Sequence, residues 1–180
     1  MPLDDVGRAQ ARGLAALLVQ DAFDRAIASD LSRARETAEL ALAGRGPAVA
    51  IDARWREMHF GAWEGLRWDE IVARYPQLAT QSSVRPRFYA PAGGESFDEL
   101  CARVRDALAS IDSRVRDGAK VLVATHAGPL HALLHVALGA DEAAALGVKF
   151  SPASVTRLQL EPRGARILEL NHVAPAPAAL

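Results

Sequence analysis

The first fifty residues alternate between helical and strand-like apolar segments. Asp4 or Asp5 can cap a first helix, and apolar residues recur at helical spacing from there to about residue 20. An apolar run, a helical segment and a second apolar run follow, at residues 26–29, 32–42 and 48–52. This order predicts a β-α-β unit, which favours parallel strands joined by a right-handed crossover.

The middle of the chain, residues 54–94, shows little periodicity. Its one predicted helix covers residues 68–75, because Pro76 disfavours a helical conformation at the residue before it. Ser96 and Glu99 then have the spacing of a capping box, in which the two side chains bind each other's backbone N–H groups. A long helix is therefore predicted from there to about residue 116.

The last third opens with a valine-rich run, residues 121–124, which is typical of a buried parallel strand. Pro129 suits the first position of a helix, so a helix is predicted over residues 129–138. Two alternating runs, 154–160 and 165–170, flank a Pro-Arg-Gly turn and predict an antiparallel hairpin.

Together these segments predict an α/β fold of three layers, α/β/α, with a mainly parallel sheet and a C-terminal antiparallel hairpin. One hydrophobic core suffices for 180 residues, so residues 1–173 are predicted to form a single domain. Residues 174–180 consist of Ala, Pro and Leu and are expected to be a disordered tail.

Composition narrows the classes of partner. The chain has 21 basic and 22 acidic residues and a formal net charge of -1, so no strongly basic surface for nucleic acid is expected. No apolar run approaches the roughly 20 residues of a membrane span, and Asp4 and Asp5 interrupt any signal peptide. A cytoplasmic protein without a membrane partner is the expectation. The single cysteine, Cys101, lies in a helical apolar series and is predicted to fill the core.

The position of His126 points most directly to chemistry. It follows the strand predicted at 121–124 and precedes the helix predicted at Pro129. Ligands of open α/β sheets bind at this edge, and the unpaired N–H groups and dipole of a helix start favour an anion. A histidine and a phosphate pocket are therefore expected together. Taken alone, the same position is also compatible with a hydrogen-bonded core histidine.

Four motifs occur in a fixed order. They are Ser29-Asp-Leu-Ser-Arg-Ala-Arg-Glu-Thr-Ala38, Glu57-Met-His-Phe-Gly-Ala-Trp-Glu-Gly65, Gly94-Glu-Ser96 and Thr125-His-Ala-Gly128. In their order and spacing the chain resembles the histidine phosphatase superfamily, the phosphoglycerate-mutase-like phosphatases. The resemblance runs from Pro2 to about His172 and implies phosphoryl transfer through a phosphohistidine intermediate.

One motif of that family does not occur in the 180 residues. Members of the family carry Arg-His-Gly at the end of an N-terminal strand, and this histidine takes up the phosphoryl group, whereas no Arg-His-Gly is found here. We therefore expect an N-terminally truncated domain without its first strand, with roughly 20 to 25 residues missing, the length of a strand and a loop. Without the nucleophile, the chain as written is expected to be inactive.

The resemblance assigns three site residues. Arg33 corresponds to a phosphate-binding arginine, and a helix start suits a bidentate grip on phosphate. Glu57 corresponds to the proton donor for the leaving alkoxide. Without the resemblance, its position is equally compatible with a solvated loop residue. His126 corresponds to the second histidine, which contacts the phosphoryl group and stabilises its charge during transfer. Arg35, by contrast, is expected to form a surface ion pair.

Other candidate residues receive no catalytic role. His131 and His135 have the spacing of a metal pair, but no carboxylate or cysteine nearby completes a site, so neither a metal nor a cofactor is expected. His131 stands where relatives often carry arginine, and His59 is a loop residue without an assigned role. An apolar pocket is expected beside Glu57, formed by three residues that follow it in the sequence: Met58, Phe60 and Trp63.

The resemblance implies a phosphomonoester hydrolase, since mutases of the family tend to carry inserted segments. The segment from Arg56 to Glu64 is most similar to α-ribazole phosphatases, which makes α-ribazole 5'-phosphate a possible substrate. Two alternatives stay open: a non-catalytic relative that binds a phosphorylated ligand or acts as an interaction protein, and a phosphoglycerate mutase. The expected partner is a small phosphorylated metabolite. The sheet edge left by the missing strand is also expected to permit self-association.

Overall fold

The structure is a computed structural model that describes residues 1–76, 78, 90–112, 118–140, 142–161 and 164–174. Three sequence predictions lie outside the described residues. They concern the end of the long helix near residue 116, the turn at 162–163 and most of the tail, 175–180.

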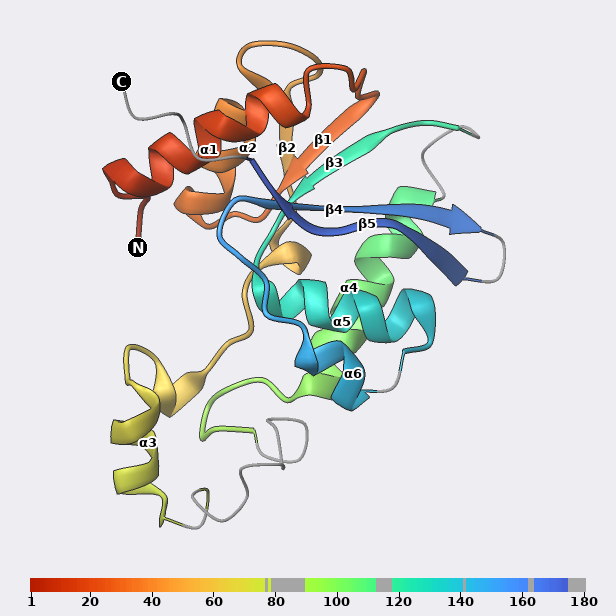
Figure 1. Cartoon of the computed structure of the whole chain (residues 1–180). Helices are drawn as coiled ribbons and strands as arrows, with labels where there is room; N and C mark the ends of the chain where they lie inside the picture. The colour runs from red at the N-terminus through yellow and green to blue at the C-terminus, as the bar shows by residue number, and fades with distance from the viewer. Residues whose placement is uncertain (77, 79–89, 113–117, 141, 162–163, 175–180) are drawn as a thin grey trace.

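A parallel three-stranded sheet forms the centre of the fold (Figure 1). Strand β1 (Arg25–Ala28) pairs with β2 (Val49–Ile51) on one side and with β3 (Val121–Ala124) on the other, and Ile27 lies opposite both Ala50 and Val123. Helix α2 (Ser32–Leu42) connects β1 to β2. The predicted parallel β-α-β unit is therefore confirmed.

Helices cover both faces of this sheet. On one face, Leu122 of β3 packs against a cluster from α1 (Asp5–Leu17), its C-terminal cap and α2. On the other, Val121 and Val123 pack against a cluster from α4 (Phe97–Asp112) and α5 (Ala127–Leu138). Successive side chains of a strand point to opposite faces, so this alternation produces the three layers expected from the sequence.

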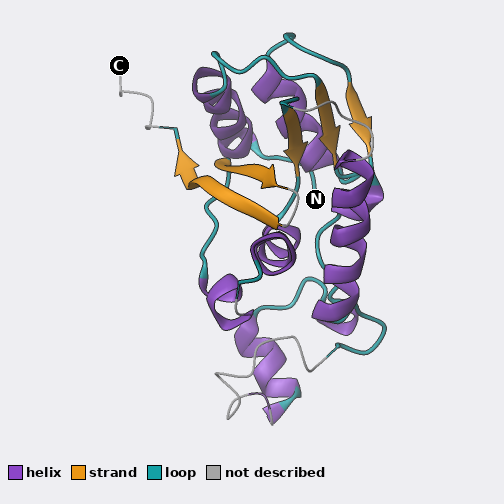
Figure 2. Cartoon of the chain, turned by 90° about the vertical axis from the view of Figure 1, so that its right-hand side faces the viewer, coloured by secondary structure: helices purple, strands orange, loops and turns teal. Residues whose placement is uncertain are grey.

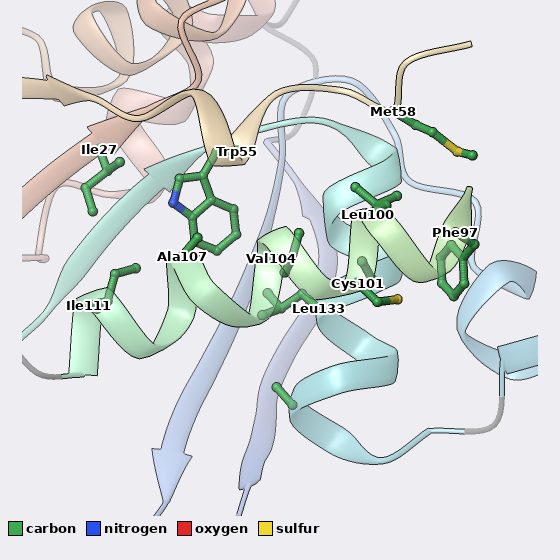
Figure 3. Close-up of a cluster of buried hydrophobic side chains, with 12 residues drawn as sticks. Ile27, Trp55, Met58, Phe97, Leu100, Cys101, Val104, Ala107, Ile111 and Leu133 are labelled. Atoms are coloured by element: carbon green, nitrogen blue, oxygen red, sulfur yellow. The ribbon is translucent and has the colours of Figure 1, made fainter. Parts of the chain in front are cut away.

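The larger core is built along α4 (Figure 3). Leu100 and Val104 are fully buried there, and Trp55 packs across the same helix at 2% exposure. The predicted capping box starts this helix: the Ser96 N–H donates to Glu99 Oε2 at 2.8 Å, and the Glu99 N–H donates to Ser96 Oγ at 3.2 Å. The core therefore fixes the segment around Trp55, which leads directly into the loop with the second motif.

The C-terminal hairpin forms its own two-stranded antiparallel sheet, β4 (Ser154–Glu161) and β5 (Gly164–Val173). Leu158 and Ala165 pack against the larger core, whereas Val155 packs against the smaller one. The hairpin lies apart from the three parallel strands (Figure 2). Among the described residues β3 pairs only with β1, so its other edge has no strand partner.

The remaining elements include two departures from the sequence prediction. Helix α5 begins at Ala127, not at Pro129, because the N–H groups of a helix's first turn have no partner within the helix, so proline fits at the third position as well as at the first. Helix α6 (Glu142–Gly147) was not predicted, since six residues are too few to show a periodic pattern. Predicted helix 68–75 appears as α3 (Trp68–Arg74), and two short 3-10 helices complete the fold, η1 (Ala53–Trp55) and η2 (Gly61–Trp63). No helix of the described part is long and apolar enough to cross a membrane.

Candidate active site

His126 lies where the sequence placed it, between the end of β3 and the start of α5. It is the N-cap residue of α5, with an extended backbone (φ -133°, ψ 173°), and its side chain is 9% exposed. Its Nε2 atom lies 3.0 Å from the Oγ atom of Ser29, a fully buried residue directly after β1. The carboxyl ends of two neighbouring parallel strands thus bring these two side chains together.

The surroundings of His126 favour its neutral form. Burial is the largest cause that lowers its pKa, the positive charges of Arg33 and Arg103 lower it further, and Asp30 opposes them, with a resulting pKa of about 4. Ser29 Oγ accepts the Leu31 N–H at 3.2 Å and keeps a second lone pair and its proton, so it can pair with Nε2 in either neutral tautomer of His126.

Arg33 lies in the first turn of α2, half-buried, and its charge acts on His126. Its guanidinium has no hydrogen bond or ion pair to any described residue, so it is open to an anion. Arg35, two residues further on, lies 3.7 Å from Glu39 in the surface ion pair expected for it. The two arginines of the same motif therefore differ in their partners: Arg35 is held in an ion pair, and Arg33 has no partner among the described residues.

Glu57 is tied to the helix that His126 caps. Its Oε1 atom accepts the N–H of Met58 at 2.8 Å and the N–H of Gly128 at 2.9 Å. A Cβ atom at position 128 would overlap Oε1, so this approach requires glycine there. The Oε2 atom makes no hydrogen bond to a described residue. The Glu57 carboxyl group is thereby fixed against Gly128, which follows His126 by two residues.

Arg103 of α4 holds the loop that carries Glu57, a role that the sequence did not reveal. Its guanidinium donates to the carbonyl oxygens of Arg54 at 2.7 Å and Glu57 at 3.2 Å. It also pairs with Glu95, whose Oε2 atom accepts from Nη2 at 2.9 Å. These partners lie 8 to 49 residues away in sequence, so no local pattern signals them.

Two cavities flank Glu57. The first, of about 260 Å³, is lined mainly by apolar residues, among them Met58 and Phe60. The second, of about 480 Å³, is lined mainly by charged residues. Trp63 does not reach either one and packs with Ile71 instead. The expectation that Trp63 lines a pocket beside Glu57 is therefore wrong, because η2 turns the chain away at Gly61.

Two other histidines contact backbone carbonyl oxygens, although His131 also lines the first cavity and His59 lines the second. His131 Nε2 lies 2.8 Å from the Val148 carbonyl oxygen, and His135 Nδ1 lies 2.9 Å from the Ala140 carbonyl oxygen. His59 is exposed in its loop. Within the described part of the chain, no group of three His, Cys, Asp or Glu side chains is placed to hold a metal ion.

A family model described as histidine phosphatase superfamily (branch 1) matches residues 1–173. The chain belongs to the histidine phosphatase superfamily. A bifunctional protein of Mycobacterium tuberculosis is 32% identical over 169 residues, which cover 93% of this chain and 46% of that protein. The adenosylcobalamin/alpha-ribazole phosphatase of Salmonella typhimurium is 32% identical over 133 residues, 74% of this chain and 65% of that protein. The chain thus spans about half to two thirds of the length of these curated relatives.

Solved structures of histidine phosphatases share the fold. A mycobacterial glucosyl-3-phosphoglycerate phosphatase in complex with inorganic phosphate superposes with a TM-score of 0.84 at 30% sequence identity, covering 96% of this chain and 88% of that one. The resemblance seen in four sequence motifs therefore extends to nearly the whole chain.

Proposed function

We propose that this histidine phosphatase domain serves a phosphomonoester hydrolase that works through a phosphohistidine intermediate. One observation carries the proposal. The Gly128 N–H, in the first turn of the helix that His126 caps, holds the carboxylate of Glu57 at 2.9 Å. This contact brings a candidate proton donor to the candidate phosphate site, which ligand binding alone does not require.

Each of the three residues has a role in this proposal. Arg33 grips the phosphoryl oxygens, and His126 contacts the same group as charge moves onto it. A nucleophilic histidine attacks phosphorus, the bond to the alcohol oxygen breaks, and the Glu57 carboxyl gives its proton to that oxygen. Water then attacks the phosphohistidine, Glu57 takes back a proton, and inorganic phosphate leaves.

Residues 1–180 contain no Arg-His-Gly, the motif that by resemblance carries the nucleophile of this scheme. We therefore propose that the 180-residue polypeptide binds phosphate but does not turn over phosphomonoesters. Calorimetric titration with inorganic phosphate tests the first half. Arg33→Ala should weaken binding at least about tenfold, since it removes a charged hydrogen-bonding partner of the anion. Arg35→Ala, the matched control, should leave binding unchanged because Arg35 pairs with Glu39.

Catalysis is tested by supplying the nucleophile. A chimera in which the Arg-His-Gly strand of a related phosphatase precedes Pro2 should hydrolyse p-nitrophenyl phosphate and form an acid-labile phosphoprotein. In that chimera Glu57→Gln should slow alkyl phosphates far more than p-nitrophenyl phosphate, because only poor leaving groups need protonation. Equal losses of rate on the two kinds of substrate would show that Glu57 is not the proton donor. Turnover by the 180 residues alone would show that another nucleophile exists.

For the substrate we propose α-ribazole 5'-phosphate, on the strength of the Arg56–Glu64 segment and of the alpha-ribazole phosphatase among the relatives. The chimera should then prefer this ester to 3-phosphoglycerate in kcat/KM. A correctly folded chimera that binds phosphate without turnover would favour the non-catalytic reading, and transfer between the hydroxyls of phosphoglycerate would favour a mutase.

We also propose self-association through β3. All four of its residues are half-buried, whereas three of the four residues of β1 are buried, and β3 pairs on one edge only within the described part. Unpaired strand edges are templates for pairing with a second chain. Sedimentation velocity should show dimers or larger species that grow with concentration, and a strict monomer at all concentrations would contradict the proposal.

A further inference from the structure

The smaller cavity beside Glu57 has an apolar wall drawn from four segments. We call it the apolar chamber. Its lining includes Met58 and Phe60 from the loop, Phe97 and Leu100 from α4, and Leu146 from α6, together with the first turn of α5. Met58, Phe97 and Leu100 lie at the same end of α4 (Figure 3). Glu57 is its one acidic lining residue, and His131 its one other titratable group.

The place of this chamber decides which part of a substrate it faces. A proton donor must come within hydrogen-bonding distance of the leaving oxygen, roughly 2.6–3.2 Å between heavy atoms. The group attached to that oxygen therefore lies on the Glu57 side of the phosphorus atom. This step rests on the proposed function, because it takes Glu57 as the donor.

The larger cavity is less suited to that group. It is lined mainly by charged side chains, and both arginines among them already have partners: Arg103 pairs with Glu95, which also lines the cavity, and Arg56 pairs with Asp30, which lies outside it. A polar or charged leaving group would have to compete with these pairs. The apolar chamber offers no such partners and gains from losing water when an apolar group enters it.

We propose that the apolar chamber binds the leaving alcohol, and that the domain acts on phosphomonoesters of small aromatic or aliphatic alcohols in preference to those of charged acids. Its volume of about 260 Å³ lies just below the roughly 300 Å³ at which sites for drug-sized molecules begin. The chamber therefore fits a group of one or two rings. Phe60 and Phe97 provide aromatic faces and edges against which such rings pack favourably.

The test uses the 180-residue chain as it stands and measures binding. Calorimetric titrations compare inorganic phosphate, 1-naphthyl phosphate and 3-phosphoglycerate at one pH. The naphthyl ester should bind at least about tenfold more tightly than phosphate, since ring burial outweighs the ordering of one rigid group. The phosphoglycerate should show no such gain.

A variant that fills the chamber locates the ring. Leu146→Trp should reduce the ratio of the two dissociation constants, phosphate to naphthyl phosphate, toward one. Leu168→Trp, on exposed β5, should keep the wild-type ratio. Thermal unfolding of both variants checks that the fold is retained. If the tryptophan prevents folding, Leu146→Ala, which enlarges the chamber, provides the second test. It should change the ratio of the two dissociation constants, whereas Leu168→Ala should not.

The outcomes separate the two proposals. If phosphate binds but the naphthyl group adds no affinity, or if Leu146→Trp leaves the ratio unchanged, the chamber does not hold the leaving group and the inference is overturned. If phosphoglycerate binds more tightly than the naphthyl ester, the substrate class is wrong. If none of the three ligands binds, the proposed phosphate site itself fails.

Discussion

Gly128→Ala is predicted to destabilise the chain, against the usual effect of this substitution. Gly128 is the second residue of α5 and has no positive φ, so alanine fits its backbone. In a helix such a change normally stabilises by about 0.5–1 kcal/mol, because alanine loses less conformational entropy on folding. Here the new Cβ would overlap Glu57 Oε1 and come within 3.3 Å of the Met58 backbone nitrogen.

The magnitude follows from the hydrogen bond that must break. Glu57 has to withdraw its Oε1 atom from the Gly128 N–H, and hydrogen bonds to charged groups contribute about 1.5–3 kcal/mol. With the helix gain of about 0.5–1 kcal/mol subtracted, the free energy of unfolding should fall by about 0.5–2.5 kcal/mol. In a Glu57→Ala background the overlap with Oε1 is gone and only the 3.3 Å contacts with Met58 remain, so the same substitution should be close to neutral.

A double-mutant cycle measures this coupling. Urea unfolding of the wild type, both single variants and the double variant, followed by circular dichroism, should give a coupling energy of about 1.5–3 kcal/mol between positions 57 and 128. A Gly128→Ala variant that is as stable as the wild type or more so would refute the reasoning. It would mean that the Glu57 carboxyl does not lie against the start of α5.

Two further predictions concern His126 and Arg103. The pKa of His126 is about 4 in the folded chain and 6.5 as its ordinary value, so the unfolded state binds more protons between these values and stability falls by about 3 kcal/mol as pH drops from 7 to 4. His126→Gln should lose this part of the pH dependence. NMR titration of the wild type should show a neutral His126 imidazole at pH 6, and a pKa near 6.5 would contradict the burial argument. Arg103→Met should lower the free energy of unfolding by about 3 kcal/mol, because it leaves the half-buried Glu95 carboxylate unpaired, whereas exposed Arg105→Met should change it by less than about 0.5.

The sequence by itself determined the elements whose cause is local. The capping box of α4 joins residues three apart, and the N-cap of α1 joins Asp4 to the Gly7 N–H, also three residues on. The β-α-β unit and the place of His126 between a strand and a helix follow from patterns of ten to twenty residues. These features were predictable because short-range hydrogen bonds and hydrophobic periodicity are set within one segment.

Tertiary structure decided how the site residues meet. Ser29 reaches His126 across 97 residues and Gly128 reaches Glu57 across 71, while Arg103 fixes a loop 46 residues away. The apolar chamber also depends on elements that meet only after folding. The physical reason is that burial, a shared hydrogen bond or a Cβ overlap depends on the distance between segments. That distance is set by how the layers pack, and no single segment carries it.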